Sequence, residues 1–279
     1  TEAEFVRDIV EDVLQKLAPR YPNQRKGLVG IEKTCEQIES FLKIESSEVK
    51  TLGIWGMAGI GKTTLATTLY DNLSYKFEDR CFLANVREKS DKLEALRDEL
   101  FSKLLKNKYY GFDSFDMCRL RRKKVFIVLD DVATSEQLEK LIVEYNFLGP
   151  GSIVIVTTRN KQIISTVDII YPSQGLSFHH SLRLFCFTVF GAEQPKDGYE
   201  DLSIGVISYC KGIPLGLKVL GTSLRKRSKE SWESELRKLQ RIPNMEIHNV
   251  LKLSYDGLDR IEKETFLDIA CFLKGHYKL

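Results

Sequence analysis

The sequence predicts an α/β fold built on a parallel sheet with helices on both faces. From Val49 onward, short runs rich in Val, Ile and Leu alternate with amphipathic stretches. The runs show no polar alternation, which is typical of strands buried on both faces of a parallel sheet. The order strand, helix, strand, helix indicates a doubly wound domain. A glycine-rich turn follows the first run, where such folds bind their ligands.

Strands and helices are expected in alternation along this part of the chain. The first helix, over residues 64–73, follows the glycine-rich turn. Leucines three and four residues apart between positions 93 and 104 form the apolar stripe of a second helix. Thr134 and Gln137 give a third helix a capping-box start. The expected strands cover residues 49–55, 81–86, 124–130, 152–158 and 168–172.

Composition indicates a soluble globular protein in a reducing compartment. The 279 residues are 43% hydrophobic, which is enough to bury a core and to make two or three domains. The longest apolar runs fall far short of the roughly 20 residues that a membrane helix needs, and no secretory leader opens the chain. Six widely spaced cysteines and four histidines form no metal-ligand pattern. Reduced thiols and a cytosolic or nuclear location are therefore expected.

The stretch GIWGMAGIGKTT contains a phosphate-binding loop. Gly56, Gly61, Lys62 and Thr63 match G-x-x-x-x-G-K-[ST] between an expected strand and an expected helix, which is the context that this motif requires. Glycines let backbone N–H groups turn toward an anion, the lysine reaches the β and γ phosphates, and the threonine hydroxyl ligates Mg²⁺. The predicted phosphate-binding residues are Gly56, Met57, Ala58, Gly59, Ile60, Gly61, Lys62, Thr63 and Thr64.

A dinucleotide-binding fold is the nearest alternative for this loop. Its fingerprint is G-x-G-x-x-G, whereas this loop reads G-x-x-G-x-G and continues with a lysine. Thr64 stands where the third glycine of that fingerprint would be. The pattern therefore favours the phosphate loop over the dinucleotide fingerprint.

The other half of the site is expected at the ends of two later strands. The buried strand in KKVFIVLDDV ends in Asp130 and Asp131, which brings two carboxylates to the sheet edge where the phosphate loop lies. Asp130 is predicted to hold Mg²⁺, directly or through water, and Asp131 to position the attacking water or accept its proton. Arg159 follows the strand GSIVIVTT, so its guanidinium should emerge at the same edge and sense a γ-phosphate.

Five motifs in order carry a resemblance to a known family. They are GMAGIGKTT, VFIVLDDV, GSIVIVTTR, YCKGIPLGLKVLG and LSYDGLDRIEKETFLDIACFLKG. With them the chain resembles the NB-ARC nucleotide-binding module of plant disease-resistance proteins, which belong to the STAND class of P-loop signalling ATPases. FEDRCFLANVRE and FLDIACFLKG resemble the subgroup that carries an N-terminal TIR domain. The resemblance covers nearly the whole chain.

The resemblance also implies residues that contact a nucleotide base. GLVGIE is similar to the family segment whose backbone contacts adenine, which points to Leu28, Val29 and Gly30. Pro214 in GIPLGLK matches a proline that the family packs near the base. On spacing alone, Pro214 is only the first residue of a helix that follows a Lys-Gly cap. The resemblance supports the roles given above to the phosphate loop and to the sheet-edge residues.

The same resemblance divides the chain into four parts. The last of them is incomplete, because the sequence ends before the family's Met-His-Asp motif, whose histidine touches the β-phosphate of ADP. The parts are a linker helix from an upstream TIR domain over residues 1–22, a nucleotide-binding α/β domain over 23–173, a small all-α domain over 174–242, and the start of a winged-helix domain over 243–279.

One turn departs from the family pattern. Where relatives commonly show LNxxEALxLF, this chain reads LSFHHSLRLF. Ser177, His180 and Ser181 thus take the asparagine, acidic and alanine positions. Polar contacts from this turn to the nucleotide-binding domain are therefore expected to differ from those of the family.

The function that the resemblance implies is a nucleotide-operated switch of an intracellular innate immune receptor. ADP between the α/β and helical domains holds them closed, exchange for ATP opens the chain so that it oligomerises, and slow hydrolysis resets it. The implied cofactors are ADP or ATP and Mg²⁺. The implied partners are TIR and leucine-rich-repeat domains outside this chain, a pathogen effector or guarded host protein, and further copies of the chain. Any NAD-cleaving activity would belong to the TIR domain.

Two other functions stay open at this point. A steady ATPase or kinase needs a substrate pocket and a nucleophile-orienting residue, for which the sequence offers no candidate outside the phosphate-loop set. A DNA-binding initiator of AAA type is the other, because residues 247–279 resemble the start of a winged helix. A net charge of +3 and basic clusters that fit solvated faces, RLRRKK and RKRSK, disfavour nucleic-acid binding.

Overall fold

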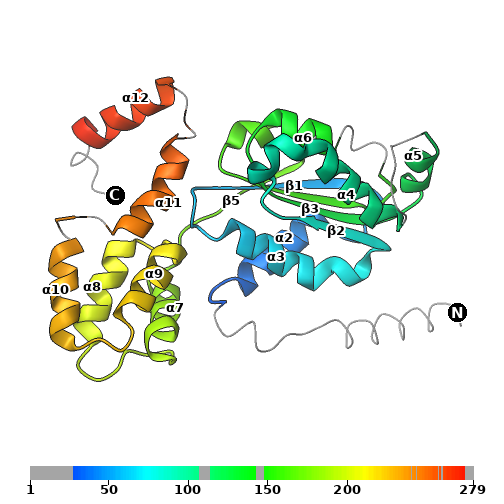
Figure 1. Cartoon of the computed structure of the whole chain (residues 1–279). Coiled ribbons are helices and arrows are strands. Elements are labelled where there is room, and N and C mark those ends of the chain that lie inside the picture. Colours follow the sequence, from blue (N-terminus) through cyan, green and yellow to red (C-terminus); the bar gives the residue numbers. More distant parts are fainter. Residues whose placement is uncertain are drawn as a thin grey trace, which may run out of the picture.

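The structure consists of an α/β region and a helical region that follow each other along the chain (Figure 1). The expected linker helix at residues 1–22 lies outside the part of the chain that is described. The computed structural model describes residues 28–106, 114–142, 148–239, 241–242, 244–256, 258 and 260–273.

Five parallel strands form the sheet, in the order β2-β3-β4-β1-β5. The predicted parallel α/β fold is therefore confirmed. Because β3, β4 and β1 are neighbours, the loops that follow these three strands lie together at one edge. The strands are β1 Lys50–Trp55, β2 Asp79–Leu83, β3 Val125–Val132, β4 Ile153–Thr158 and β5 Ile169–Pro172.

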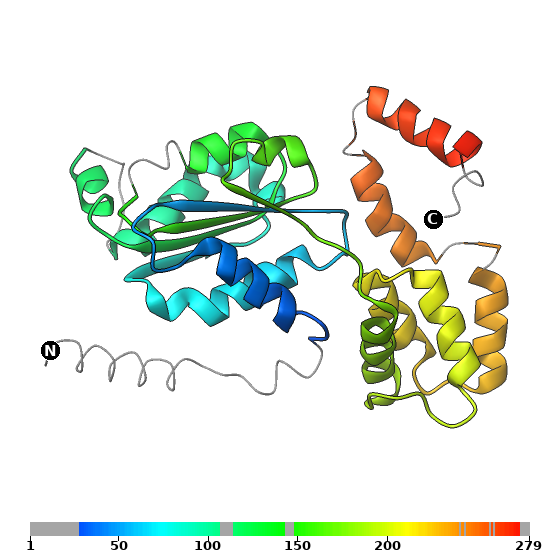
Figure 2. The ribbon, with the colours of Figure 1, turned by 180° about the vertical axis from the view of Figure 1, so that it is seen from behind.

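Helices cover both faces of the sheet, as Figures 1 and 2 show from opposite sides. Successive residues of β3 point to opposite faces: Phe126 and Val128 pack with α2 and α3, whereas Ile127 and Leu129 pack with α4 and α6. This two-sided burial is the reason that the strand is apolar throughout. The helices of this region are α2 Glu32–Leu42, α3 Lys62–Leu73, α4 Leu93–Leu105, α5 Ser114–Leu120 and α6 Ser135–Leu141, with 3-10 turns η2 Ser74–Lys76, η3 Val86–Lys92 and η5 Lys161–Ile164.

Strand β3 differs from the prediction at its carboxyl end. The strand does not end at the two aspartates but continues to Val132. Leu129 pairs with Val156 and Val132 pairs with Thr158, so β3 carries one more residue than β4 over this stretch. Such an extra residue is a β-bulge, and bulges redirect side chains near functional sites. Here the bulge lies at the two consecutive carboxylates, Asp130 and Asp131.

The helical region packs around an aromatic centre. Trp232 is 1% exposed, its indole Nε1 donates to the carbonyl oxygen of Leu224 at 3.0 Å, and the rings of Phe185, Phe190 and Tyr199 surround it. Among the residues that the structure describes, no helix is both long and apolar enough to cross a membrane. The helices are α7 Phe178–Phe190, α8 Glu200–Cys210, α9 Pro214–Leu224, α10 Lys229–Leu239, α11 Met245–Asp256 and α12 Arg260–Asp268, and a π-helical turn, η6 Ile269–Leu273, follows.

Candidate functional site

The phosphate loop forms the turn between β1 and α3, as the sequence predicts. Gly59 and Gly61 have φ angles of +76° and +104°, in the left-handed region that favours glycine. Gly61 is the N-cap of α3, and no side chain caps the helix there. The first N–H groups of α3 and the positive end of its dipole therefore face the space in front of the loop. This arrangement suits an anion.

Lys62 is buried inside the loop that it closes. Its Nζ donates to the carbonyl oxygens of Gly56 at 2.8 Å and Met57 at 3.0 Å. Burial, and next the nearby Arg159 guanidinium, lower the pKa of Lys62 to about 8, while the carboxylates of Asp131 and Asp130 act in the opposite direction. Burial thus disfavours the charged ammonium, and a bound phosphate would favour it.

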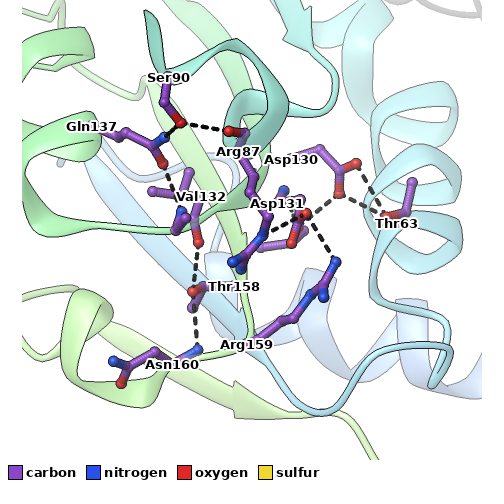
Figure 3. Close-up of polar contacts among 12 residues, drawn as sticks. Thr63, Arg87, Ser90, Asp130, Asp131, Val132, Gln137, Thr158, Arg159 and Asn160 are labelled. Atoms are coloured by element: carbon purple, nitrogen blue, oxygen red, sulfur yellow. Dashed lines mark hydrogen bonds and ion pairs between the residues drawn. The ribbon is translucent and has the colours of Figure 1, made fainter. Parts of the chain in front are cut away.

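Asp130 is buried and faces α3. The residue is 1% exposed. Thr63 Oγ1 donates to its two carboxylate oxygens at 2.9 Å and 3.1 Å (Figure 3). Thr157 Oγ1 donates to Oδ1 at 2.7 Å. A hydroxyl and a carboxylate in contact are oxygen ligands of the kind that Mg²⁺ takes. The structure therefore brings together the two residues predicted to hold the metal.

Asp131 has φ +55° at the bulge, and its carboxylate has other partners than that of Asp130. Its backbone N–H donates to Thr157 Oγ1 at 2.8 Å. Its Oδ2 accepts from Arg87 Nε at 3.0 Å and from Arg159 Nη2 at 3.2 Å. Figure 3 shows the two arginines reaching Asp131 from different segments. The residue predicted to handle the attacking water is therefore held by two cations in this structure.

Helix α9 of the helical region closes the other side of the loop. Pro214 begins α9, as predicted, and the N–H of Leu215 donates to the carbonyl oxygen of Gly59 at 3.2 Å. The packing is close, because a Cβ added to Gly59 would lie 2.8 Å from Leu215 Cβ. The phosphate loop thus contacts both regions of the chain.

Two cavities lie along this contact, and we call them cavity A and cavity B. Their volumes are about 350 Å³ and 330 Å³. They share Gly61, Thr64, Pro214 and Lys218 as lining residues, so they adjoin one another. A cleft of this size is in the range of small-molecule sites.

Most of the predicted contact residues line one of these cavities. Gly56, Met57 and Asp130 do not, and they contact Lys62 or Thr63 instead. Lining cavity A are Leu28, Val29, Gly30, Ile60, Gly61, Thr64 and Pro214. Lining cavity B are Ala58, Gly59, Gly61, Lys62, Thr63, Thr64, Asp131, Arg159 and Pro214.

His180 lies in the turn that differs from the family pattern, and it also lines cavity A. Gly30 has φ +75°, and a Cβ added there would lie 2.7 Å from Cγ of the His180 ring. Ser177, in the same turn, caps α7 by accepting from the His180 N–H at 3.3 Å. The turn therefore makes a contact with the α/β region through an imidazole ring.

Among the residues of this site that sequence reasoning missed are Arg87, Thr157 and Lys218. Arg87 pairs with Asp131, Thr157 joins the two aspartates, and Lys218 lines both cavities. Thr157 stands at the end of a predicted strand beside Arg159, which is a signal that could have found it. Arg87 and Lys218 carry no such signal, because their approach to the site depends on how distant segments pack.

The sheet order, the glycine loop ahead of α3 and the Thr63–Asp130 pair define the class of the protein as a P-loop NTPase. Residues 31–195 match the NB-ARC domain, and the chain belongs to this family.

Plant disease-resistance proteins are close relatives in sequence. Disease resistance protein RUN1 of Vitis rotundifolia is 42% identical over 285 residues, which cover 98% of this chain and 21% of that protein. TMV resistance protein N of Nicotiana glutinosa is 40% identical over 290 residues, which cover 100% of this chain and 25% of that protein. The chain thus spans a fifth to a quarter of the length of these relatives.

Solved structures with low sequence identity share the fold. Drosophila ORC bound to DNA gives a TM-score of 0.54 at 14% identity, over 83% of this chain and 69% of that one. Cdc6p from Pyrobaculum aerophilum gives 0.51 at 15% identity, over 74% and 62%. At such identities the similarity shows the fold alone.

Proposed function

We propose that this chain is the ADP/ATP-operated switch of a plant intracellular immune receptor. The observation that carries the proposal is the cleft with walls from two regions. One wall is the phosphate loop, the other is the start of α9, and the Leu215 N–H bonds to Gly59 across it. A nucleotide in adjoining cavities A and B would contact both walls, so its identity would bias how the two regions dock.

In the resting state, ADP occupies the cleft and keeps the regions together. Leu28, Val29, Gly30 and Pro214 surround the base in cavity A. The loop N–H groups and Lys62 hold the phosphates in cavity B. We assign to this state the arrangement in which α9 rests on the loop.

Thr63 and Asp130 are the proposed ligands of Mg²⁺. In the described ranges no group of three or more His, Cys, Asp or Glu side chains forms a separate metal site. Mg²⁺ is commonly held by one or two protein oxygens together with substrate phosphates. When bound, the ion would neutralise charge on the phosphates during hydrolysis. Asp131, at the bulge, is the proposed residue for orienting the attacking water.

Exchange for ATP opens the chain in this proposal. Arg159 lines cavity B, where it would contact a γ-phosphate that ADP lacks. To move the chain from mostly closed to mostly open, ATP must favour the open state over ADP by about 5 kcal/mol. A neighbouring domain can supply part of this free energy. Hydrolysis of ATP then resets the switch.

The rest of the receptor lies outside this chain and is part of the proposal. A TIR domain precedes the switch and a leucine-rich-repeat domain follows it, and the latter senses a pathogen effector or a guarded host protein. The active form is an oligomer of the receptor, in the cytosol or nucleus. The proposed boundaries are 23–173 for the α/β domain, 174–242 for the helical domain, and 243 onward for a winged-helix domain.

The test is to purify the chain without added nucleotide, denature it, and identify what it releases by chromatography. Near-stoichiometric ADP is expected, because a switch retains its product, and Lys62→Ala should abolish it. An empty wild-type protein with sustained ATP turnover would instead identify a steady ATPase and contradict the proposal. An empty protein that does not bind added ADP would contradict it as well.

A further inference from the structure

Two arginines share one carboxylate oxygen beside the phosphate loop. Arg87 Nε lies 3.0 Å from Asp131 Oδ2, and Arg159 Nη2 lies 3.2 Å from the same atom (Figure 3). A single carboxylate carries one negative charge, so it does not neutralise both guanidinium groups. If one of the two arginines moves away, Asp131 therefore still has the other as its partner.

The two arginines differ in their access to the cleft. Arg159 and Asp131 both line cavity B, whereas among the described residues Arg87 is not part of that lining. Arg87 lies on the 3-10 turn η3, after β2, on a different segment from Arg159. A ligand in cavity B therefore meets Arg159 and not Arg87.

The Arg87 segment is tied to the end of β3. Ser90 Oγ donates to the carbonyl oxygen of Arg87, and Gln137 Nε2 donates to Ser90 Oγ at 2.8 Å. The other end of the same amide, Oε1, accepts from the Ala133 N–H at 2.7 Å. Gln137 is 2% exposed and Ser90 is exposed, so the Gln137 end of this link is shielded from water. One buried side chain thus joins the backbone of η3 to the residue that follows β3.

The charge count around Asp131 favours an incoming anion. One positive charge is not matched by a carboxylate here. The cations are Lys62, Arg87, Arg159 and Lys218, and the carboxylates are Glu88, Asp130 and Asp131. A terminal phosphate in cavity B would attract a cation that lines the cavity. Of the two arginines on Asp131, Arg159 meets that description, because it lines cavity B and Arg87 does not.

We propose that Arg87 is a positioning residue for the nucleotide site: it retains the Asp131 carboxylate when Arg159 leaves it for the terminal phosphate of a nucleoside triphosphate. This inference rests on the proposed function. With a diphosphate, both arginines stay on Asp131. With a triphosphate, Arg159 moves and Arg87 stays, so Asp131 remains paired and directed at the cleft. Without Arg87, movement of Arg159 to the phosphate would leave the partly buried Asp131 carboxylate with neither arginine as a partner.

The experiment measures dissociation constants of this chain for ADP and for the non-hydrolysable triphosphate AMP-PNP. Arg87→Gln should raise the AMP-PNP constant about fivefold relative to the ADP constant, because only in the triphosphate state is the partly buried Asp131 carboxylate then left without either arginine. Arg87→Lys keeps the charge but not the Nε donor, so the ratio of the AMP-PNP constant to the ADP constant should change about twofold in this variant. If Arg87→Gln does not fold, Arg87→Lys is compared with the wild-type chain instead.

Two further variants separate positioning from a general structural effect. In an Arg159→Gln background, Arg87→Gln should leave the ratio unchanged, because Asp131 then has no partner to lose on triphosphate binding. Arg122→Gln, at an exposed arginine far along the sequence from this site, should change neither constant. An unchanged ratio in Arg87→Gln, or the same change with and without Arg159, would overturn the inference.

The outcome for the wild-type chain distinguishes this inference from the proposed function. If the chain binds neither nucleotide, or if Lys62→Ala does not abolish the binding, the proposed function fails and the inference fails with it. If the chain binds both and Arg87→Gln leaves their ratio at the wild-type value, only the role of Arg87 is wrong.

Discussion

At the scale of single residues, Lys62 is the most perturbed group of the site. It is 7% exposed, and its pKa is lowered to about 8 by burial and then by Arg159. In the structure its ammonium is satisfied by two carbonyl oxygens of its own loop. The site therefore holds a cation that loses its proton only slightly above neutral pH, which is unusual for a lysine.

This pKa predicts how nucleotide affinity depends on pH. Phosphate binds the protonated ammonium, so the ADP affinity should be nearly constant below pH 7 and fall by up to about tenfold per pH unit above pH 8. Titration calorimetry between pH 6.5 and 9.5 would measure this fall. Lys62→Met should bind more weakly without this dependence, and an equal fall in that variant would assign the proton to another group.

The same Lys62 side chain affects folding stability in the opposite direction: rising pH weakens nucleotide binding but increases the contribution of Lys62 to stability. Between about pH 8 and 10.5, the unfolded chain keeps the proton that native Lys62 has lost. Because the unfolded state then binds more protons, the contribution of Lys62 to the free energy of unfolding rises with pH. Weaker binding above pH 8 therefore does not arise from loss of the fold through this residue.

At the scale of elements, the segment before α2 and helix α7 meet at Gly30 and His180. Gly30 has φ +75° and lies against the imidazole ring. Gly191, after α7, has φ +72° with nothing within 4 Å of an added Cβ. The two glycines thus have the same backbone conformation, but only Gly30 is in a crowded contact.

This pair predicts a difference between two alanine variants. Gly191→Ala should lower the free energy of unfolding by about 1 kcal/mol, from left-handed strain alone. Gly30→Ala should cost about 2 kcal/mol or more, because the methyl group also displaces His180, and it should weaken ADP binding at cavity A. Urea unfolding and ADP titration measure both effects. His180→Ala added to Gly30→Ala should recover part of the loss, and no recovery would exclude the contact as the cause.

The elements show which parts of the site the sequence could predict. The phosphate loop and Arg159 follow strands that their own residues specify, and both aspartates lie near the end of another such strand, so local pattern was sufficient to predict their positions. The Arg87–Asp131 and Gly30–His180 contacts depend on long-range packing and on a bulge that no turn residue in DDVA signals. Periodicity gives no information about either.

At the scale of the whole molecule, the two tryptophans report on the two regions. Trp55 ends β1 at the sheet edge, and Trp232 is the centre of the helical core. The chain has no other tryptophan. The fluorescence of each residue therefore follows the unfolding of its own region.

A ligand that contacts both walls should stabilise both regions. In a Trp55→Phe variant, ADP at about 100 times its dissociation constant should stabilise the Trp232 transition by about 2.7 kcal/mol. Circular dichroism of the whole chain should show the same shift, and Lys62→Ala should remove both. If ADP stabilises the remainder of the chain but leaves the Trp232 unfolding transition unchanged, the cleft does not have two walls.

The hydrogen bond between Gly59 and Leu215 also bears on the order in which the chain is made. Pro214 follows Thr64 by 150 residues, so the phosphate loop leaves the ribosome well before α9 exists. Chains fold from the N-terminus during synthesis, so the sheet can form while one side of its cleft is still open. A nucleotide that needs both walls, as we propose, would therefore be captured late in biogenesis, by a chain in which both regions have folded.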